Sequence, residues 1–190
     1  MALAGFVYCL TCLIVLLSSP GVAIDQFETV IPDWVDSFHF PRPSLRVAYG
    51  SQNVTIERQF SPAEVLLQPK VSITNAGNRD LFTLVMVDPD PPGPQIPILR
   101  NILHWIVVNI PAQSTNASEQ GDHLAPYLSP TPVQGVHRYY FLLFRQKKQI
   151  HAGSLVGSLS RTLFSVRVFT ENYDLGYPVD GVFFTSRVII

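Results

Sequence analysis

The sequence predicts an all-β fold, a mainly antiparallel β-sandwich with short peripheral helices. Short runs rich in β-branched and aromatic residues recur along the chain, and turn-forming residues separate them, which is typical of strands. Sixteen prolines, spread through the chain, favour short strands and shaped loops over long helices. The 190 residues show no internal repeat or low-complexity block, so we expect one domain with an ample core.

The N-terminal residues 1–23 indicate a secretory signal peptide. Residues 3–17 are almost wholly apolar, and Gly21-Val22-Ala23 places small residues at the expected cleavage positions. The alternative is an uncleaved membrane anchor, but the run is shorter than the roughly 20 residues that a spanning helix needs. We therefore expect cleavage after Ala23, no stable membrane span, and a secreted, extracellular domain of residues 24–190.

Export would limit the chemistry and the partners of the mature chain. Both cysteines, Cys9 and Cys12, lie in the predicted signal peptide, so no thiol would remain for catalysis or metal binding. The triplets that begin at Asn53 and Asn116 fit N-glycosylation in the secretory route. A net charge of −1 without a basic run gives no reason to expect nucleic acid as a partner.

The first half of the domain alternates between strands and turns. Alternating apolar and polar residues predict strands at residues 45–49, 54–56 and 70–74. The first two are expected to form a hairpin around the turn-like residues 50–53. Residues 25–40 favour a short helix or turn, and the proline in residues 61–64 suits a single helical turn.

The second half carries the predicted core strands. Apolar runs bounded by proline or glycine lie in the segments 82–93, 104–111 and 135–144. A polar loop is expected at residues 112–124. Residues 163–173 follow a near-helical spacing that predicts a short amphipathic helix, and residues 182–185 form a last strand.

Polar side chains stand at the ends of these core strands, namely Asp88, Asp90, His104, His137 and Tyr139. If the strands are neighbours, these groups meet at one edge of the sheet. The spacing of the two aspartates lets both face one way, but it fits equally a turn whose carboxylates cap backbone amides. His137 and Tyr139 share one face of their strand. Arg138 points to the other face, where we expect a structural ion pair or hydrogen bond.

The order of three motifs resembles the phosphatidylethanolamine-binding protein (PEBP) family. The motifs are D-P-D-x-P from Asp88, H-W-x-V-x-N-I-P from His104, and P-x-P-x-x-G-x-H-R-Y-x-F from Pro130. That family includes Raf kinase inhibitor proteins, plant flowering regulators and a yeast carboxypeptidase inhibitor. The resemblance covers nearly the whole chain after residue 24 and implies a PEBP-like fold with a ligand pocket.

The resemblance implies that Asp88 lines this pocket with His104, His137 and Tyr139. Either histidine alone would more often be a structural residue than a ligand. Together, imidazole N–H and tyrosine O–H groups donate well to phosphate oxygens, and a nearby carboxylate helps to keep a histidine protonated. Such a pocket could bind a phosphate while its carboxylate faces an ammonium group. A zwitterionic phosphoethanolamine head carries both charges.

The resemblance also assigns Asp90 to the pocket or to the turn, and Pro130 to a rigid lip of the pocket formed by residues 130–132. The family usually has glycine at Ser129 and proline at Val133, so the lip is expected to be reshaped. Many animal members continue into a C-terminal helix that partly covers the pocket. The sequence given stops at Ile190, so the mouth is expected to be more open.

We therefore expect a secreted monomer that binds phospholipid head groups or another small phosphate-bearing anion. The alternative is a serine protease inhibitor or signalling modulator that binds a protease or receptor through surface loops such as 112–124. Asp–His pairs can support acid–base catalysis, and two histidines with an aspartate can hold zinc. However, no G-x-S-x-G or H-E-x-x-H motif selects such chemistry. We expect no catalytic residue, metal or cofactor.

Overall fold

The computed structural model describes residues 44–56, 58–151 and 159–188. The expected signal peptide and the expected helix or turn at residues 25–40 lie outside these ranges. The strands are β1 (Ser44–Tyr49), β2 (Gln52–Asn53), β3 (Gln59–Phe60), β4 (Lys70–Thr74), β5 (Leu81–Asp88), β6 (Ile102–Pro111), β7 (Asp122–Ala125), β8 (His137–Gln146) and β9 (Asp180–Ser186). The helices are α2 (Ala117–Gln120) and α3 (Val166–Asn172).

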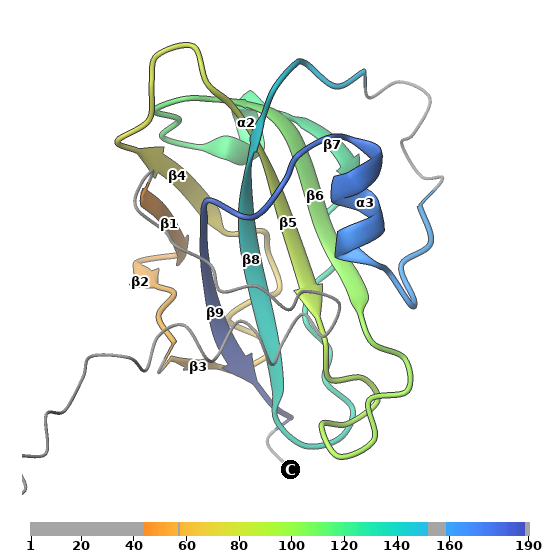
Figure 1. Ribbon diagram of the computed structural model, residues 1–190. Helices are drawn as coiled ribbons and strands as arrows, with labels where there is room; N and C mark the ends of the chain where they lie inside the picture. The colour runs from red at the N-terminus through yellow and green to blue at the C-terminus, as the bar shows by residue number, and fades with distance from the viewer. Residues whose placement is uncertain (1–43, 57, 152–158, 189–190) are drawn as a thin grey trace, which may run out of the picture.

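The described strands form two sheets (Figure 1). The small sheet has the order β2-β1-β4, and the large sheet has the order β3-β9-β8-β5-β6-β7. The fold is mostly β with short helices, as predicted. The antiparallel prediction holds only in part, because β3 pairs with β9 in parallel whereas the other neighbours are antiparallel.

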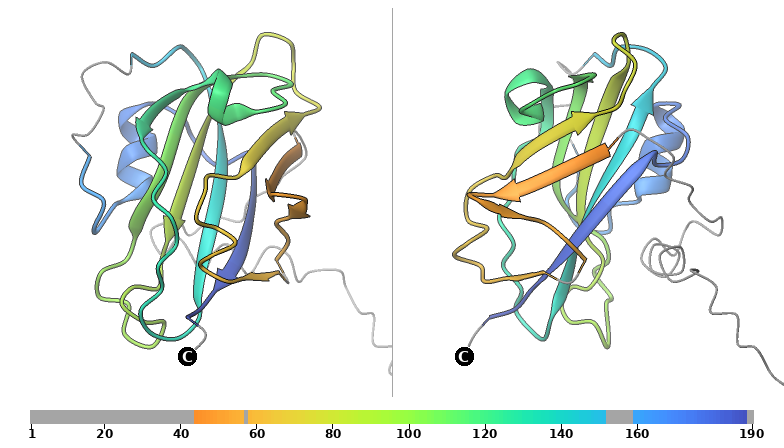
Figure 2. Two further views of the ribbon diagram at one scale, coloured as in Figure 1. Left: turned by 180° about the vertical axis from the view of Figure 1, so that it is seen from behind. Right: turned by 90° about the vertical axis from the view of Figure 1, so that its left-hand side faces the viewer.

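The large sheet is buried on both faces. Phe82, Leu84 and Met86 of β5 belong to a cluster that also contains residues of β1 and β4. Val85 and Val87, whose side chains point the other way, belong to a second cluster that contains residues of α3. The small sheet and α3 thus lie on opposite sides of the large sheet (Figure 2). A strand covered on both faces is mostly apolar, which explains the run from Leu84 to Val87 in β5.

The predicted hairpin forms with a shorter turn than expected. Ala48 pairs with Asn53 and Tyr49 with Gln52, so Gly50 and Ser51 alone make the turn. Gly50 has a φ of 59°, a value that glycine adopts without strain. Residues 54–56, predicted as the second strand, lie beyond β2 and are not part of a strand.

The helical predictions hold only in part. A helix forms where residues 163–173 predicted one, but it spans only Val166–Asn172 (α3). It begins after Ser165, because the Ser165 side chain accepts a hydrogen bond from the Val168 amide at 3.2 Å and caps the helix. Residues 62–65 form a turn rather than a helix. The segment predicted as a polar loop at 112–124 contains α2 and most of β7.

Candidate functional site

A cavity of about 210 Å³ lies where β5 ends and where β6 and β8 begin. This is the lower end of the large sheet in Figure 1. Its lining residues come from these strands and from the loops that follow β5 and β7: Asp88, Pro91, Pro92, Leu99, Ile102, His104, Leu128, Thr131, Val133, His137 and Tyr139. The structure thus brings together four of the six predicted site residues, namely Asp88, His104, His137 and Tyr139.

Asp88 and His137 form a buried ion pair at the base of the cavity. His137 Nδ1 donates to Asp88 Oδ2 at 2.8 Å. The side chain of Asp88 is 4% exposed and that of His137 is 3% exposed. His137 Nε2 lies 3.1 Å from the carbonyl oxygen of Gln134. Burial lowers the pKa of His137, but the hydrogen bond and charge of Asp88 and the Gln134 carbonyl outweigh it and raise the pKa. Both ring nitrogens face oxygen atoms that can only accept, which favours the protonated, cationic ring.

His104 is held in the opposite protonation state. Its Nδ1 lies 2.7 Å from the carbonyl oxygen of Leu128, which can only accept, so Nδ1 carries a proton. Burial lowers the pKa of His104 and outweighs the Leu128 carbonyl and the charge of Asp88, which act the other way. The ring is therefore neutral near pH 7, and its Nε2 is a hydrogen-bond acceptor.

Tyr139 supplies a hydrogen-bond donor to the cavity. Its side chain is fully buried, and its hydroxyl makes no hydrogen bond within the described part of the chain. Burial, followed by the Asp88 carboxylate, which approaches the hydroxyl without reaching hydrogen-bonding geometry, raises the pKa of Tyr139, so the hydroxyl keeps its proton. The ring packs edge-on against His104, with centroids 5.2 Å apart. The cavity therefore contains a cation, an anion, a free donor and a neutral acceptor.

Asp90 does not line the cavity. Arg138 Nη2 donates to Asp90 Oδ1 at 2.6 Å, and Arg138 Nε and its backbone amide donate to Oδ2 at 2.9 and 2.8 Å. Of the two roles left open for Asp90, the geometry favours the turn. The side chain of Arg138 lies on the opposite face of β8 from His137 and forms the predicted ion pair.

Pro130 is buried but is not among the lining residues, whereas its neighbour Thr131 is. The lip extends to Val133, which lines the cavity and is 85% exposed. Leu99 and Leu128 add further exposed apolar surface at the mouth. Sequence reasoning missed these two residues, because an exposed leucine in a loop carries no signal until the loops are placed together.

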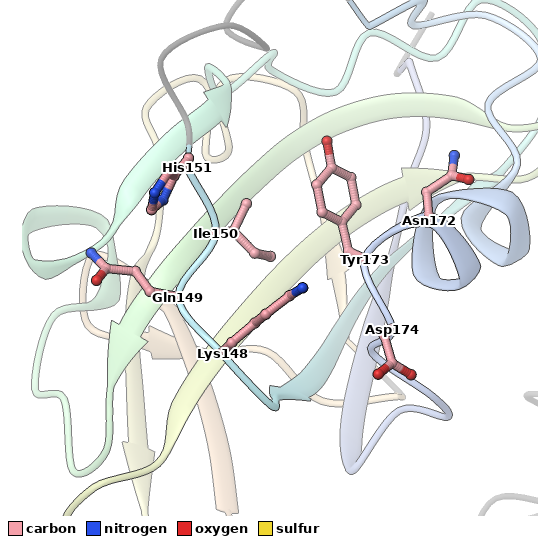
Figure 3. Close-up of a pocket in the computed structure, with 7 residues that line it drawn as sticks. All are labelled: Lys148, Gln149, Ile150, His151, Asn172, Tyr173 and Asp174. Carbon is pink, nitrogen blue, oxygen red and sulfur yellow. The ribbon is translucent and has the colours of Figure 1, made fainter.

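A larger hollow of about 480 Å³ lies between residues 148–151 and 172–174 (Figure 3). Most of its lining residues are exposed, and Asp174 is neutralised by Lys147 at 2.7 Å in a surface ion pair. Such pairs contribute little energy. The smaller cavity instead holds buried ionisable groups with shifted pKa values, which is typical of functional sites. We therefore take it as the candidate site.

The described residues contain no group of three or more His, Cys, Asp or Glu side chains that could hold a metal ion. Within the same part of the chain, no helix is long and apolar enough to cross a membrane.

The sequence and the fold were compared with known proteins. The family described as Phosphatidylethanolamine-binding protein matches residues 48–180. Protein TERMINAL FLOWER 1 of Arabidopsis thaliana is 40% identical over 158 residues, which cover 83% of this chain and 86% of that protein.

Two solved structures share the fold. A phosphatidylethanolamine-binding protein from Plasmodium vivax aligns with a TM-score of 0.70 at 19% identity, covering 86% of this chain and 95% of that one. A carboxypeptidase Y inhibitor, solved in complex with its cognate proteinase, aligns with a TM-score of 0.68 at 23% identity, covering 87% and 91%. At these identities the likeness shows the fold alone. Since the family match spans most of the sequence, the chain belongs to the phosphatidylethanolamine-binding protein family.

Proposed function

We propose that this protein binds the phosphate-bearing head group of a phospholipid, or another small phosphate-bearing anion, in the cavity at the end of β5. The observation that carries the proposal is the Tyr139 hydroxyl, a buried donor without a partner among the described residues. A buried donor left unpaired costs roughly 1–3 kcal/mol, and a phosphate oxygen that accepts from it would remove this cost.

The charges beside Tyr139 suit a zwitterionic head group. The cation of His137 and the anion of Asp88 cancel, so a ligand with one phosphate and one ammonium group matches the cavity better than a bare multivalent anion. At about 210 Å³, the cavity is smaller than typical small-molecule sites. It can enclose a head group but not acyl chains, which would lie over the apolar mouth formed by Leu99, Leu128 and Val133.

Replacement of Tyr139 by phenylalanine tests the proposal. Tyr139→Phe removes the unpaired donor without removing the ring. We expect affinity for sn-glycero-3-phosphoethanolamine to fall by roughly 1.5–3 kcal/mol, the size of a hydrogen bond to a charged group. The free energy of unfolding should stay unchanged or rise slightly, because the mutation removes a buried group that had no partner. Isothermal titration calorimetry and urea unfolding measure the two quantities.

The adjacent Tyr140→Phe is a matched control, since Tyr140 belongs to the cluster on the other face of the sheet. It should leave the affinity unchanged. Equal affinity in wild type and Tyr139→Phe would contradict the placement of the phosphate. Dihexanoyl phosphatidylethanolamine and inorganic phosphate separate the two ligand sources. Tighter binding of the lipid identifies a head group, and equal or tighter binding of phosphate identifies a free anion.

Export is part of the proposal. It is supported by the apolar run at residues 3–17, by the small residues before Ile24, and by the exposed position of Asn53 in β2. The second acceptor, Asn116, is half-buried, and its side chain accepts a hydrogen bond from Ser118 Oγ at 2.8 Å. The mature protein should begin at Ile24 and lose mass on treatment with a peptide N-glycosidase. A membrane-bound product that retains Met1 would contradict export.

The second candidate function is binding to a protein partner through surface loops, and the same fold in a proteinase-bound carboxypeptidase Y inhibitor supports it. The discriminating experiment changes the loop at 112–124 and the cavity separately. A protein-binding role should survive Tyr139→Phe and fail when the loop is replaced. A head-group carrier should show the reverse.

A further inference from the structure

Arg161 is a half-buried arginine that binds only main-chain carbonyl groups. Its Nη1 donates to the carbonyl oxygens of Leu103 at 3.1 Å and His104 at 3.2 Å, and its Nη2 donates to that of Pro126 at 2.8 Å. Its own carbonyl accepts from the Leu103 amide at 2.7 Å. No carboxylate pairs with Arg161 in the described ranges. A planar guanidinium with several fixed donors suits this bridging role better than the single ammonium of lysine.

These bonds join two walls of the cavity. His104 stands on β6, and Leu128 stands in the loop after β7, two residues beyond Pro126. The two walls also bond directly, because the Leu128 amide donates to the His104 carbonyl at 2.8 Å and His104 Nδ1 donates to the Leu128 carbonyl at 2.7 Å. Arg161 therefore bonds to His104 itself and to Pro126 near Leu128, on both sides of the hydrogen bond that orients the His104 ring.

These bonds determine which ring nitrogen of His104 can bind a ligand. With Nδ1 committed to Leu128, Nε2 is the remaining ring nitrogen, and it has no hydrogen-bond partner among the described residues. Burial lowers the pKa of His104, and the positive charges of Arg161 and His137 act in the same direction. Asp88 on β5 and the Leu128 carbonyl oppose them, and Tyr139 on β8 stays neutral. The net result is a neutral ring whose Nε2 accepts.

We propose that Arg161 is a positioning residue that sets the ligand selectivity of the cavity. It holds His104 against Leu128 so that Nε2 is presented as an acceptor, and the favoured ligand then carries an N–H donor as well as a phosphate oxygen. This inference rests on the proposed function and deepens it. A primary ammonium head group satisfies both Tyr139 and His104, whereas a quaternary ammonium head group has no N–H to give to His104.

Two probes of equal charge test the inference. sn-Glycero-3-phosphoethanolamine has an ammonium with N–H donors, and sn-glycero-3-phosphocholine has a quaternary ammonium without them. Wild-type protein should bind the ethanolamine probe roughly tenfold more tightly, a ratio typical of one hydrogen bond to a charged group. Equal wild-type affinities for the two probes would overturn the inference. If the wild type binds neither probe, the proposed function itself fails.

Two substitutions separate positioning from charge. Arg161→Met removes the charge and the donors, so the selectivity ratio should fall towards one and the pKa of His104, followed by NMR, should rise. Arg161→Lys keeps the charge but cannot reach all three carbonyls. Its selectivity should also fall, while the pKa of His104 stays lowered. Arg167→Met, which removes an exposed arginine of α3 that pairs with Glu171, should change neither quantity.

An unchanged selectivity ratio in Arg161→Lys, with wild-type binding intact, would overturn the inference. If Arg161→Met fails to fold, the lysine variant decides alone, because it retains the buried charge. A loss of thermal stability without a change in the ratio would mean that Arg161 is only a structural brace, and this outcome also overturns the proposal.

Discussion

The central strands β5, β6 and β8 carry a buried polar cluster at each end, and the two clusters differ in how completely their hydrogen bonds are made. The cavity cluster consists of Asp88, His104, His137 and Tyr139. The opposite cluster consists of the buried residues Thr83, Asn109 and Gln146, with the exposed Asp122 of β7 at its edge, and we name it the Asn109 cluster. Both depend on the same antiparallel pairing, so the contrast between them is chemical rather than architectural.

The Asn109 cluster is closed by bonds within the chain. Asn109 Nδ2 donates to Asp122 Oδ2 at 2.7 Å and to the Ile150 carbonyl at 2.8 Å. Its Oδ1 accepts from Gln146 Nε2 and from the Ile150 amide, both at 2.9 Å. Gln146 Oε1 accepts from Thr83 Oγ1 at 2.9 Å. Every donor and acceptor of the Asn109 amide is thus used, and a fully satisfied buried network stabilises a single arrangement.

Among the residues that the structure describes, the cavity cluster has no hydrogen-bond partner for the Tyr139 hydroxyl or for His104 Nε2. An open donor and an open acceptor beside an ion pair reduce stability, but they provide bonds that a ligand can complete. The comparison teaches that burial of polar groups does not distinguish a structural cluster from a binding site. What distinguishes them is whether the bonds close within the chain.

The largest effect is expected when the ion pair of the cavity cluster is broken. Asp88→Ala leaves the buried His137 without its carboxylate and removes the acceptor of the Asp90 amide. Loss of one partner of a buried pair costs about 3–5 kcal/mol, so urea unfolding should show a loss near the lower end of that range. Binding of glycerophosphoethanolamine should disappear. A change in stability within about 0.5 kcal/mol would contradict the assignment of this pair as buried and intact.

A smaller loss is expected at the other end of the strands. Asn109→Ala removes the four side-chain bonds and places alanine at a φ of 56°, a conformation that asparagine tolerates better. The free energy of unfolding should fall by about 2–3 kcal/mol. Affinity for the ligand should not change, because the cluster is remote from the cavity. Asn172→Ala, at an exposed position in α3, is the control and should shift stability by less than about 0.5 kcal/mol. Weakened ligand binding in Asn109→Ala would contradict the assignment of the Asn109 cluster to a purely structural role.

The smallest effect is the pH dependence of stability, and it should arise mainly in the cavity cluster. The pKa of His137 is raised on folding, so its contribution is complete below the unfolded value of about 6.5 and is lost as pH rises through the folded pKa. The pKa of His104 is lowered, so stability is lost as pH falls below about 6.5. Together the two histidines favour a maximum near that pH.

Substitution of each histidine shows which one causes the loss of stability at high pH and which one causes the loss at low pH. His137→Gln should flatten the loss on the alkaline side, and His104→Gln should flatten the loss that sets in as pH falls below about 6.5. Asn109→Ala should lower the whole curve without changing its shape. Thermal denaturation at a series of pH values measures all three. An unchanged alkaline limb in His137→Gln would show that the ion pair with Asp88 does not control it.

The parts of the fold that follow from local pattern were predictable. The strands β5, β6 and β8 come from long apolar runs, and their buried environment on both faces requires such runs. The strand β3, by contrast, has two residues and exists because it pairs with β9, which is distant in the chain. No local pattern could indicate it.

The same limit applies to the site. The four residues of the cavity cluster are all strand residues, at or near the strand ends that meet at this edge of the sheet, so pattern and family resemblance could bring them together. The protonation of His104 depends on a carbonyl 24 residues away, and the role of Arg161 depends on a contact across 57 residues. Such tertiary contacts have no signature in a single sequence.

The ion pair of Asp90 and Arg138 has a further consequence for protein engineering. The two acids of the turn each hold their own cation, and the two cations, His137 and Arg138, point to opposite faces of β8. Because Asp90 is bound by a bidentate guanidinium outside the cavity, this ion pair does not depend on the charge that His137 carries inside the cavity. Substitutions at His137 can tune the electrostatic preference of the pocket while the Asp90 pair continues to anchor the turn that shapes it. Asp88 is less suitable, because its carboxylate also accepts a hydrogen bond from the Asp90 amide in that turn.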